Sequence, residues 1–383
     1  MYATRPLSQL LKSPESLTAQ PDGPNSGYLV IQDEESETYS CFGLCKNRTL
    51  KELPFPQNKE LTVQYETGSG ENSSVSLNPV FLIPVLNQPL SSNRYYAIVP
   101  HGKRKGEAFT CSREEDKINC CFCRCIKDIK PKPLDPNNIY QQFHIIPYEG
   151  LCTTYGTFFA TSITSDGFPP SFLRQKGWTI RTKTPHNFNL GTAQGLDSNL
   201  RARFPDSDLS HRTQHPFTIT GKYKQFLPCN FLVYCYSMYY EVTLEQRWEQ
   251  IYTCEKKNNQ DHNSVVIDTL VENEEVFVGG AKALWTKENG FVWFKRYGGG
   301  GQQMSVGLRA EIVERMKWEH ERGGWVGGEE REVKISKEFK GSGDWGVFRC
   351  YVLVERFNLS RMDGSLVLSY DFKHFDVMKS KWE

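Results

Sequence analysis

The feature that most constrains the fold is an alternation of apolar and polar residues, with a period of two, in the last third of the chain. One set of alternating positions is mostly apolar: Val306, Leu308, Ala310, Ile312, Glu314, Met316 and Trp318. The positions between them are mostly charged: Gly307, Arg309, Glu311, Val313, Arg315, Lys317 and Glu319. Because successive side chains of a strand point to opposite faces of its sheet, the pattern predicts a long, half-buried strand of an antiparallel sheet.

The same stretch also has helical features. Leu308, Ile312 and Met316 are spaced by four residues, and the Arg, Glu, Met and Lys residues among them favour helices. Trp318 continues the apolar face of a strand, so we predict a strand over 306–321 and keep a helix as the alternative. On this interpretation His320, between two glutamates, is an ordinary strand residue and not a catalytic base.

Length and charge exclude some functions. The 383 residues can form two or three domains, each with its own core. The 46 basic and 45 acidic side chains leave a net charge of +1, so no global field attracts nucleic acid. The one compact basic run, His101 to Lys105, lacks interleaved aromatic residues and is interpreted as a solvated loop. A protein partner or a small ligand is therefore expected, rather than nucleic acid.

The N-terminal segment carries Arg5 and Lys12 among polar residues and has no apolar stretch of signal-peptide length. No run of the sequence approaches the ~20 apolar residues of a membrane-spanning helix. The sequence thus predicts a soluble cytoplasmic protein without a transmembrane segment.

The distribution of strand signals predicts a mainly β fold of two antiparallel, sandwich-like modules with few short helices. Short strand candidates between Pro, Gly, Asn and Ser clusters indicate an N-terminal Cys-rich domain with long loops over residues 1–220. Longer alternating runs indicate a C-terminal domain of long strands over residues 221–383. Within it, Asp363-Gly364 separates two alternating apolar runs and predicts a hairpin.

Twelve cysteines are unusual for an intracellular chain, and eight of them lie between Cys41 and Cys152. The densest group is Cys120, Cys121, Cys123 and Cys125. On a single strand the last three would share one face, and a tetrahedral zinc site would need partners from another strand. Buried free thiols are the favoured interpretation, with zinc, redox chemistry or acylation as alternatives. No cofactor is predicted.

A second group of metal-ligating types is Asp206, Asp208, His211 and His215. It does not match the H-E-x-x-H pattern, and a polar surface loop is the favoured interpretation. The sequence contains neither the G-x-S-x-G motif of serine hydrolases nor a phosphate-binding G-x-x-x-x-G-K-S/T loop. No catalytic residue is therefore predicted.

Four long stretches carry a family resemblance: Gly23 to Asn47, Leu53 to Val63, Tyr239 to Tyr252 and Leu359 to His374. They resemble a plant-specific family catalogued as domain of unknown function 1262. The resemblance implies no activity, cofactor or site residue. It does imply a setting, because members of that family are associated with stress and defence responses in plants.

Three functional hypotheses follow. The favoured one is a non-enzymatic binding or interaction module linked to stress or defence, because no convergent catalytic residues are visible and β-modules often serve as binding scaffolds. The first alternative is a membrane-active protein resembling pore-forming β toxins, although the many Arg and Glu residues on the strands would be costly against lipid. The second is an enzyme whose site is assembled from distant residues.

Overall fold

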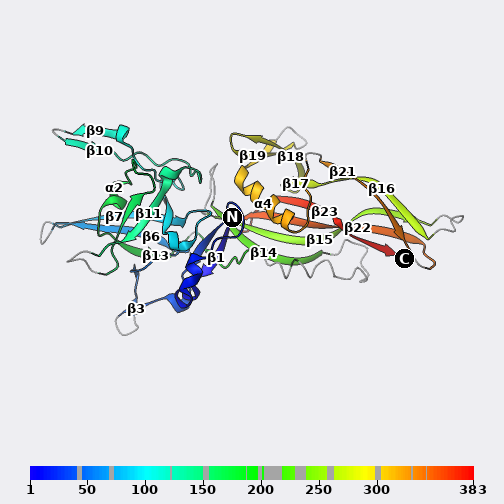
Figure 1. Ribbon diagram of the computed structural model, residues 1–383, viewed down its shortest axis with the longest axis horizontal. Helices are drawn as coiled ribbons and strands as arrows, with labels where there is room; N and C mark the ends of the chain where they lie inside the picture. Colours follow the sequence, from blue (N-terminus) through cyan, green and yellow to red (C-terminus); the bar gives the residue numbers. More distant parts are fainter. Residues whose placement is uncertain are drawn as a thin grey trace. The chain divides into compact units, whose positions relative to one another are not determined.

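Figure 1 shows the computed structural model of the chain. The structure describes all residues except 41–44, 69–72, 121–122, 150–154, 187, 197–200, 202–217, 229–238, 257–262, 298–302, 329–330 and 342. The fold is mainly β, with 51% of residues in strands and 13% in helices, which confirms the predicted fold class. None of the described helices is both long enough and apolar enough to cross a membrane.

The chain divides into two compact units. The first comprises Met1–Ala193 and Phe226–Tyr239, and the second comprises Gln194–Gln225 and Tyr240–Glu383. Each unit has its own sheet and is described by itself. A domain boundary at residue 220 stays a prediction.

The first unit is built on a seven-stranded antiparallel sheet. In spatial order its strands are β12 (Phe158–Ser162), β11 (Gln142–Pro147), β8 (Arg94–Ile98), β7 (Ser74–Pro84), β6 (Glu60–Thr67), β13 (Thr179–Lys183) and β5 (Thr49–Leu50). Alternating apolar residues of β6 and β7, such as Leu61, Val63 and Val80, are fully buried and pack with Trp178 and Phe158. This burial explains why the N-terminal strand candidates fold as the sequence predicts.

Smaller elements surround this sheet. They are the parallel pair β1 (Tyr2–Pro6) and β2 (Gly27–Ile31), the antiparallel pairs β3 (Tyr39–Ser40) with β4 (Cys45–Lys46) and β9 (Lys117–Cys120) with β10 (Cys123–Ile126), and helices α1 (Leu7–Lys12) and α2 (Ser171–Arg174). Short 3-10 turns cover Pro14–Thr18, Glu34–Ser36, Leu90–Ser92, Glu114–Asp116 and Ile139–Gln141. In strand β14 (Thr218–Pro228), Phe226 is the antiparallel partner of Tyr2.

The second unit contains longer strands. Their spatial order is β15 (Tyr239–Glu255), β22 (Val347–Arg361), β23 (Leu366–Trp382), β17 (Glu274–Val278), β18 (Ala281–Glu288), β19 (Phe291–Tyr297) and β20 (Gln303–Arg309). A separate two-stranded ribbon pairs β16 (Ser264–Glu272) with β21 (Glu332–Lys340). Strands β22 and β23 form the predicted hairpin, because the Arg361 backbone N–H donates to Ser365 across the Asp363-Gly364 turn.

The prediction of a strand over 306–321 is right only at its start. Strand β20 ends at Arg309, and helix α4 follows from Ala310 to Arg322. In α4 the residues Val313, Met316 and His320 are buried, and their spacing of three and four is that of one helix face. The helix formers Glu, Arg, Met and Lys therefore decided the local structure, and His320 is a helix residue, not a strand residue.

Helix α4 lies against the long strands (Figure 1). The His320 ring stacks on Phe372 of β23, with ring centroids 3.9 Å apart, and meets Phe357 of β22 edge-on at 4.7 Å. Opposite residues of the two strands share this face, since Glu355 is the register partner of Phe372 and Phe357 that of Tyr370. The helix thus buries one face of the centre of the sheet.

Candidate functional site

The predicted cysteine cluster lies on a hairpin and not on a single strand. Cys120 ends β9, whereas Cys123 and Cys125 share strand β10. The register pairs Cys120 with Cys123, the two ends of a C-x-x-C segment, and this spacing is one that zinc sites use. Cys125 is exposed, and Cys121 lies outside the described residues. Zinc binding here stays an untested alternative to free thiols.

The other predicted candidates contribute no described site. Asp206, Asp208, His211 and His215 all lie outside the described residues. In the basic run, His101 is exposed, and its Nε2 lies 2.8 Å from a carboxylate oxygen of Glu60.

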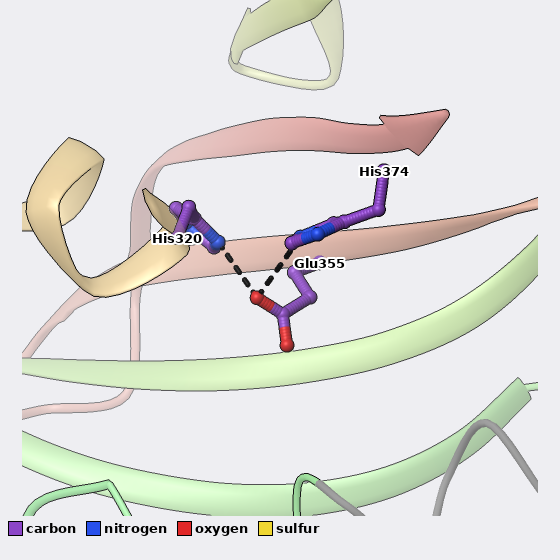
Figure 2. Close-up of side chains that lie close together, drawn as sticks. All are labelled: His320, Glu355 and His374. Carbon is purple, nitrogen blue, oxygen red and sulfur yellow. Dashed lines mark hydrogen bonds and ion pairs between the residues drawn. The ribbon is translucent and has the colours of Figure 1, made fainter. Parts of the chain in front are cut away.

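A cluster that the sequence did not indicate lies beneath α4. His320 of α4, Glu355 of β22 and His374 of β23 converge so that their ligand-type atoms lie within 4.8 Å of one another (Figure 2). His320 Nδ1 is 2.8 Å and His374 Nε2 is 3.2 Å from the same oxygen, Oε2 of Glu355. No more than 1% of any of the three residues is exposed, so solvent and substrate cannot reach the cluster in this conformation.

Two further side chains complete the hydrogen bonding of Glu355. Arg201 donates from Nε to Oε1 and from Nη2 to Oε2, both at 2.8 Å, in the bidentate geometry of a strong ion pair. Gln246 of β15 donates from Nε2 to Oε1 at 2.7 Å. Five donors therefore occupy a carboxylate that offers about four lone-pair sites. Arg201 also donates from Nη1 to the backbone oxygen of Glu319 in α4 at 2.7 Å.

The strand register explains how these residues meet. Glu355 lies opposite Gln246 on β15 and opposite Phe372 on β23, and Leu353 lies opposite His374. The next step of the β22 ladder pairs Val352 with Met378, so residues 375–377 bulge out of β23 immediately after His374. Bulges of this kind change the direction of neighbouring side chains and often lie beside functional sites.

Burial and charge set the protonation states. Burial lowers the pKa of His320 to about 4, an effect larger than the opposing one of the neighbouring Glu355 carboxylate. Burial alone would raise the pKa of Glu355, but hydrogen bonds from His320 and His374 hold it well below its usual value. The carboxylate is thus ionised, and its charge is balanced by the Arg201 guanidinium. Since a carboxylate only accepts, the imidazole nitrogens that face it carry the protons.

The residue types raise the question of a metal, because two histidines and a carboxylate form known sites for zinc and non-haem iron. Two observations disfavour one here. Arg201 places a cation on both oxygens of Glu355. In addition, Nε2 of His320 and Nδ1 of His374 have no hydrogen-bond partner among the described residues, whereas a metal-bound histidine normally donates its second N–H. We therefore assign a hydrogen-bonded cluster rather than a metal centre.

An open groove lies elsewhere in the second unit, with a volume of about 690 Å³. Its lining residues come from β16, β17, β18 and β21 and the residue before β21: Leu270, Glu272, Glu274, Glu275, Val276, Lys282, Ala283, Leu284, Trp285, Arg331 and Glu332. Leu270 and Leu284 are 63% and 55% exposed. Trp285 lies between two cations, since Arg331 Cζ and Lys317 Nζ are 5.6 and 5.5 Å from its ring centroid.

The groove carries more negative than positive charge. Glu272 and Glu332 are direct partners across β16 and β21, and like charges in that position destabilise a strand pair. Lys282 pairs with Glu272 and with Glu275, and Lys317 pairs with Glu274. Glu332 has no cationic partner in an ion pair among the described residues. The surface thus combines exposed apolar side chains, an aromatic ring and excess acidity.

Comparison with known proteins adds a family match for part of the chain. The model of a family described as "Protein of unknown function (DUF1262)" matches residues 22–122. The matched residues include the first two of the four stretches that carry the family resemblance, Gly23 to Asn47 and Leu53 to Val63. No curated protein matches the sequence. Among solved structures, the crystal structure of Cry35Ab1 is similar to this chain. The alignment covers 86% of this chain and 90% of the Cry35Ab1 chain, with 13% sequence identity and a TM-score of 0.43.

Proposed function

We propose that the protein is a non-enzymatic binding module and that the groove of the second unit is its ligand site. The observation that carries the proposal is the groove itself, in which Leu270 and Leu284 are exposed and Trp285 is half-buried beside surplus carboxylates. Exposed apolar groups rimmed by polar ones are typical of binding surfaces. The most concentrated group of catalytic residue types, by contrast, is closed to substrate beneath α4.

The chemistry of the groove favours an extended peptide with basic and apolar side chains. Its apolar side chains would contact Leu270 and Leu284, and its positive charges would complement Glu272 and Glu332. The ribbon of β16 and β21 has no third strand among the described residues, so an extended ligand could also pair with its edge. The family resemblance suggests plant stress or defence as the setting of this binding.

The cysteines support a reducing location. Among the described residues, Cys111, Cys125, Cys254 and Cys350 have free thiols. Free thiols persist in the cytosol and are uncommon in small secreted domains. A cytoplasmic location is therefore part of the proposal.

The membrane-active alternative loses part of its support. Long alternating strands would favour it, but residues 310–322 of the alternating stretch that begins at Val306 form helix α4. The long strand β22 is buried on both faces from Val352 to Glu355 within the sheet. We therefore do not favour it over binding.

The test is fluorescence anisotropy with a labelled twelve-residue peptide of alternating Arg and Leu, and with a matched Glu and Leu peptide. The full chain should bind the basic peptide at least tenfold more tightly. The double variant L270S/L284S should lose at least tenfold in affinity, and L366S, at the exposed β22–β23 turn, should lose none. Equal loss in both variants, or no preference for the basic peptide, would contradict the proposed groove. Turnover of a defined substrate that one polar substitution abolishes would contradict the non-enzymatic role.

A further inference from the structure

Helix α4 depends on a histidine for its attachment to the sheet. His320 is the last buried residue of the helix and is 0% exposed. Its ring stacks on Phe372 and meets Phe357 edge-on, and its Nδ1–H donates to Glu355. The neutral imidazole satisfies this environment, because it offers one donor to the carboxylate and an apolar ring face to the aromatic residues.

The protonated imidazole would not. Nε2 of His320 and Nδ1 of His374 are buried and have no partner among the described residues. In the neutral rings these atoms bear lone pairs. A proton on either would create a buried donor without an acceptor and a charge without water, and both are costly.

The surrounding charges do not compensate for such a proton. Glu355 is already neutralised by Arg201, which reaches both its oxygens. On α4 itself, Glu319 pairs with Arg315. A second cation beside the Arg201 guanidinium would be repelled by it.

The other charged groups near the C-terminal half of α4 are also paired or lie outside the cluster. Glu274 of β17 accepts from Lys317 of α4 and from Tyr370 of β23. Asp376, in the bulge of β23, lies next to Gly324, beyond the end of the helix. The remaining titratable group facing His320 is His374, and a charge on one imidazole opposes a charge on the other.

We propose that the His320–Glu355–His374 cluster is an acid-sensitive lock, in which protonation of His320 releases helix α4 from the sheet. The direction follows from linkage: the released state takes up the proton more readily, because burial lowers the pKa of His320 from 6.5 to about 4 in the closed state. Attachment of α4 is therefore complete above pH 6.5 and weakens as the pH falls towards 4. This inference concerns regulation and does not depend on ligand binding in the groove.

The matched variant is H320N/H374Q. The Asn amide nitrogen takes the place of His320 Nδ1 and the Gln amide nitrogen that of His374 Nε2, so both donors to Glu355 are kept while both imidazole rings are lost. The control is H101N, which removes an exposed histidine of the first unit.

The experiment is hydrogen exchange of peptides from residues 310–322 in the full chain, corrected for the intrinsic pH dependence of exchange. In the wild-type protein and in H101N, protection of α4 should fall about tenfold per pH unit between pH 6.5 and 4.5, the slope of a one-proton linkage. In H320N/H374Q the protection should be independent of pH over that range. Protection that is constant in the wild type, or that falls equally in the double variant, would overturn the lock.

Two further measurements keep the proposal testable if the double variant folds poorly. Histidine side-chain NMR of the wild-type protein should show no protonation of His320 while α4 remains protected. Titration of His320 near pH 6.5 with α4 still protected would contradict the proposal. Stoichiometric zinc in the wild-type protein, whose removal by a chelator abolishes the protection of α4 at pH 7, would replace the lock with a metal centre.

Discussion

The two faces of the β22–β23 hairpin bury charge in different ways. Glu355 and Arg356 are neighbours in sequence and point to opposite faces. On the α4 face, Glu355 is held by one cation and by three uncharged donors, and it has no contact with water. On the opposite face, Asp371 accepts from two guanidinium groups, those of Arg247 at 2.6 Å and Arg356 at 2.5 and 2.7 Å.

The second network continues outward to solvent. Lys373 lies 2.8 Å from a carboxylate oxygen of Glu249 and 2.9 Å from one of Glu275, and Lys282 joins Glu275 to Glu272. The Arg247 side chain is 18% exposed and also pairs with Glu249, and the Arg356 side chain is 29% exposed. The Arg201 side chain is 16% exposed, and its carboxylate partner among the described residues is Glu355 alone. The two faces thus differ in whether an arginine keeps another charged partner or water when its carboxylate is lost.

The largest expected effect is on the face covered by helix α4, which we call the closed face. Replacing Glu355 with Leu should lower the free energy of unfolding by about 3–5 kcal/mol, because Arg201 then remains as a largely buried cation without its carboxylate. Urea denaturation followed by far-UV circular dichroism measures the change. The double variant R201M/E355L should recover a large part of it, since it removes both charges. A loss below 1 kcal/mol for E355L would mean that the two faces are equivalent.

The opposite face of the hairpin, which carries Asp371 and which we call the open face, should respond less strongly. Replacing Asp371 with Asn should cost about 2 kcal/mol, because the hydrogen bonds lost are charge-assisted. The cost is limited because Arg247 keeps Glu249 as a second carboxylate partner and Arg356 is 29% exposed. The same denaturation experiment compares D371N with E355L. An equal or larger loss in D371N would reverse the order of the two faces.

How far the sequence could predict these features depends on whether the residues involved lie close together in the chain. The β22–β23 hairpin was predictable, because its signal, Asp363-Gly364 between alternating runs, is local. The closed cluster was not, since Arg201 and Glu355 are 154 residues apart in sequence and meet only through strand register and helix packing. His320 was assigned to the wrong element, because a period of two and a spacing of four overlap in that stretch.

A smaller effect concerns the pH dependence of stability, which should differ between the two faces of the hairpin. Hydrogen bonds from Lys373 and Lys282 lower the pKa of Glu275 from 4.5, although burial alone would raise it. Its contribution is thus present above pH 4.5 and is lost as the pH falls below that value, whereas the His320 contribution is lost between pH 6.5 and 4. Replacing Glu275 with Gln should cost about 1 kcal/mol at pH 7.

Denaturation of E275Q and wild-type protein at several pH values tests this separation. The two stability curves should run parallel from pH 7 to 5 and converge below pH 4.5. A difference that closes between pH 6.5 and 5 would show that the open face shares the histidine-linked proton.

The smallest effect is expected at a solvent-exposed ion pair outside the β22–β23 hairpin. On the β16–β21 ribbon, Nζ of Lys334 lies 3.1 Å from Oδ1 of Asp268, and the two side chains are 64% and 56% exposed. In water the Coulomb attraction of such a pair is nearly cancelled by hydration and by the entropy of holding two mobile side chains, so K334A should change stability by less than about 0.5 kcal/mol. That change should disappear in 1 M NaCl, because the Debye length is then ~3 Å. An effect of K334A as large as that of E275Q would mean that exposure does not rank these charges, and the explanation offered for the two faces would fail with it.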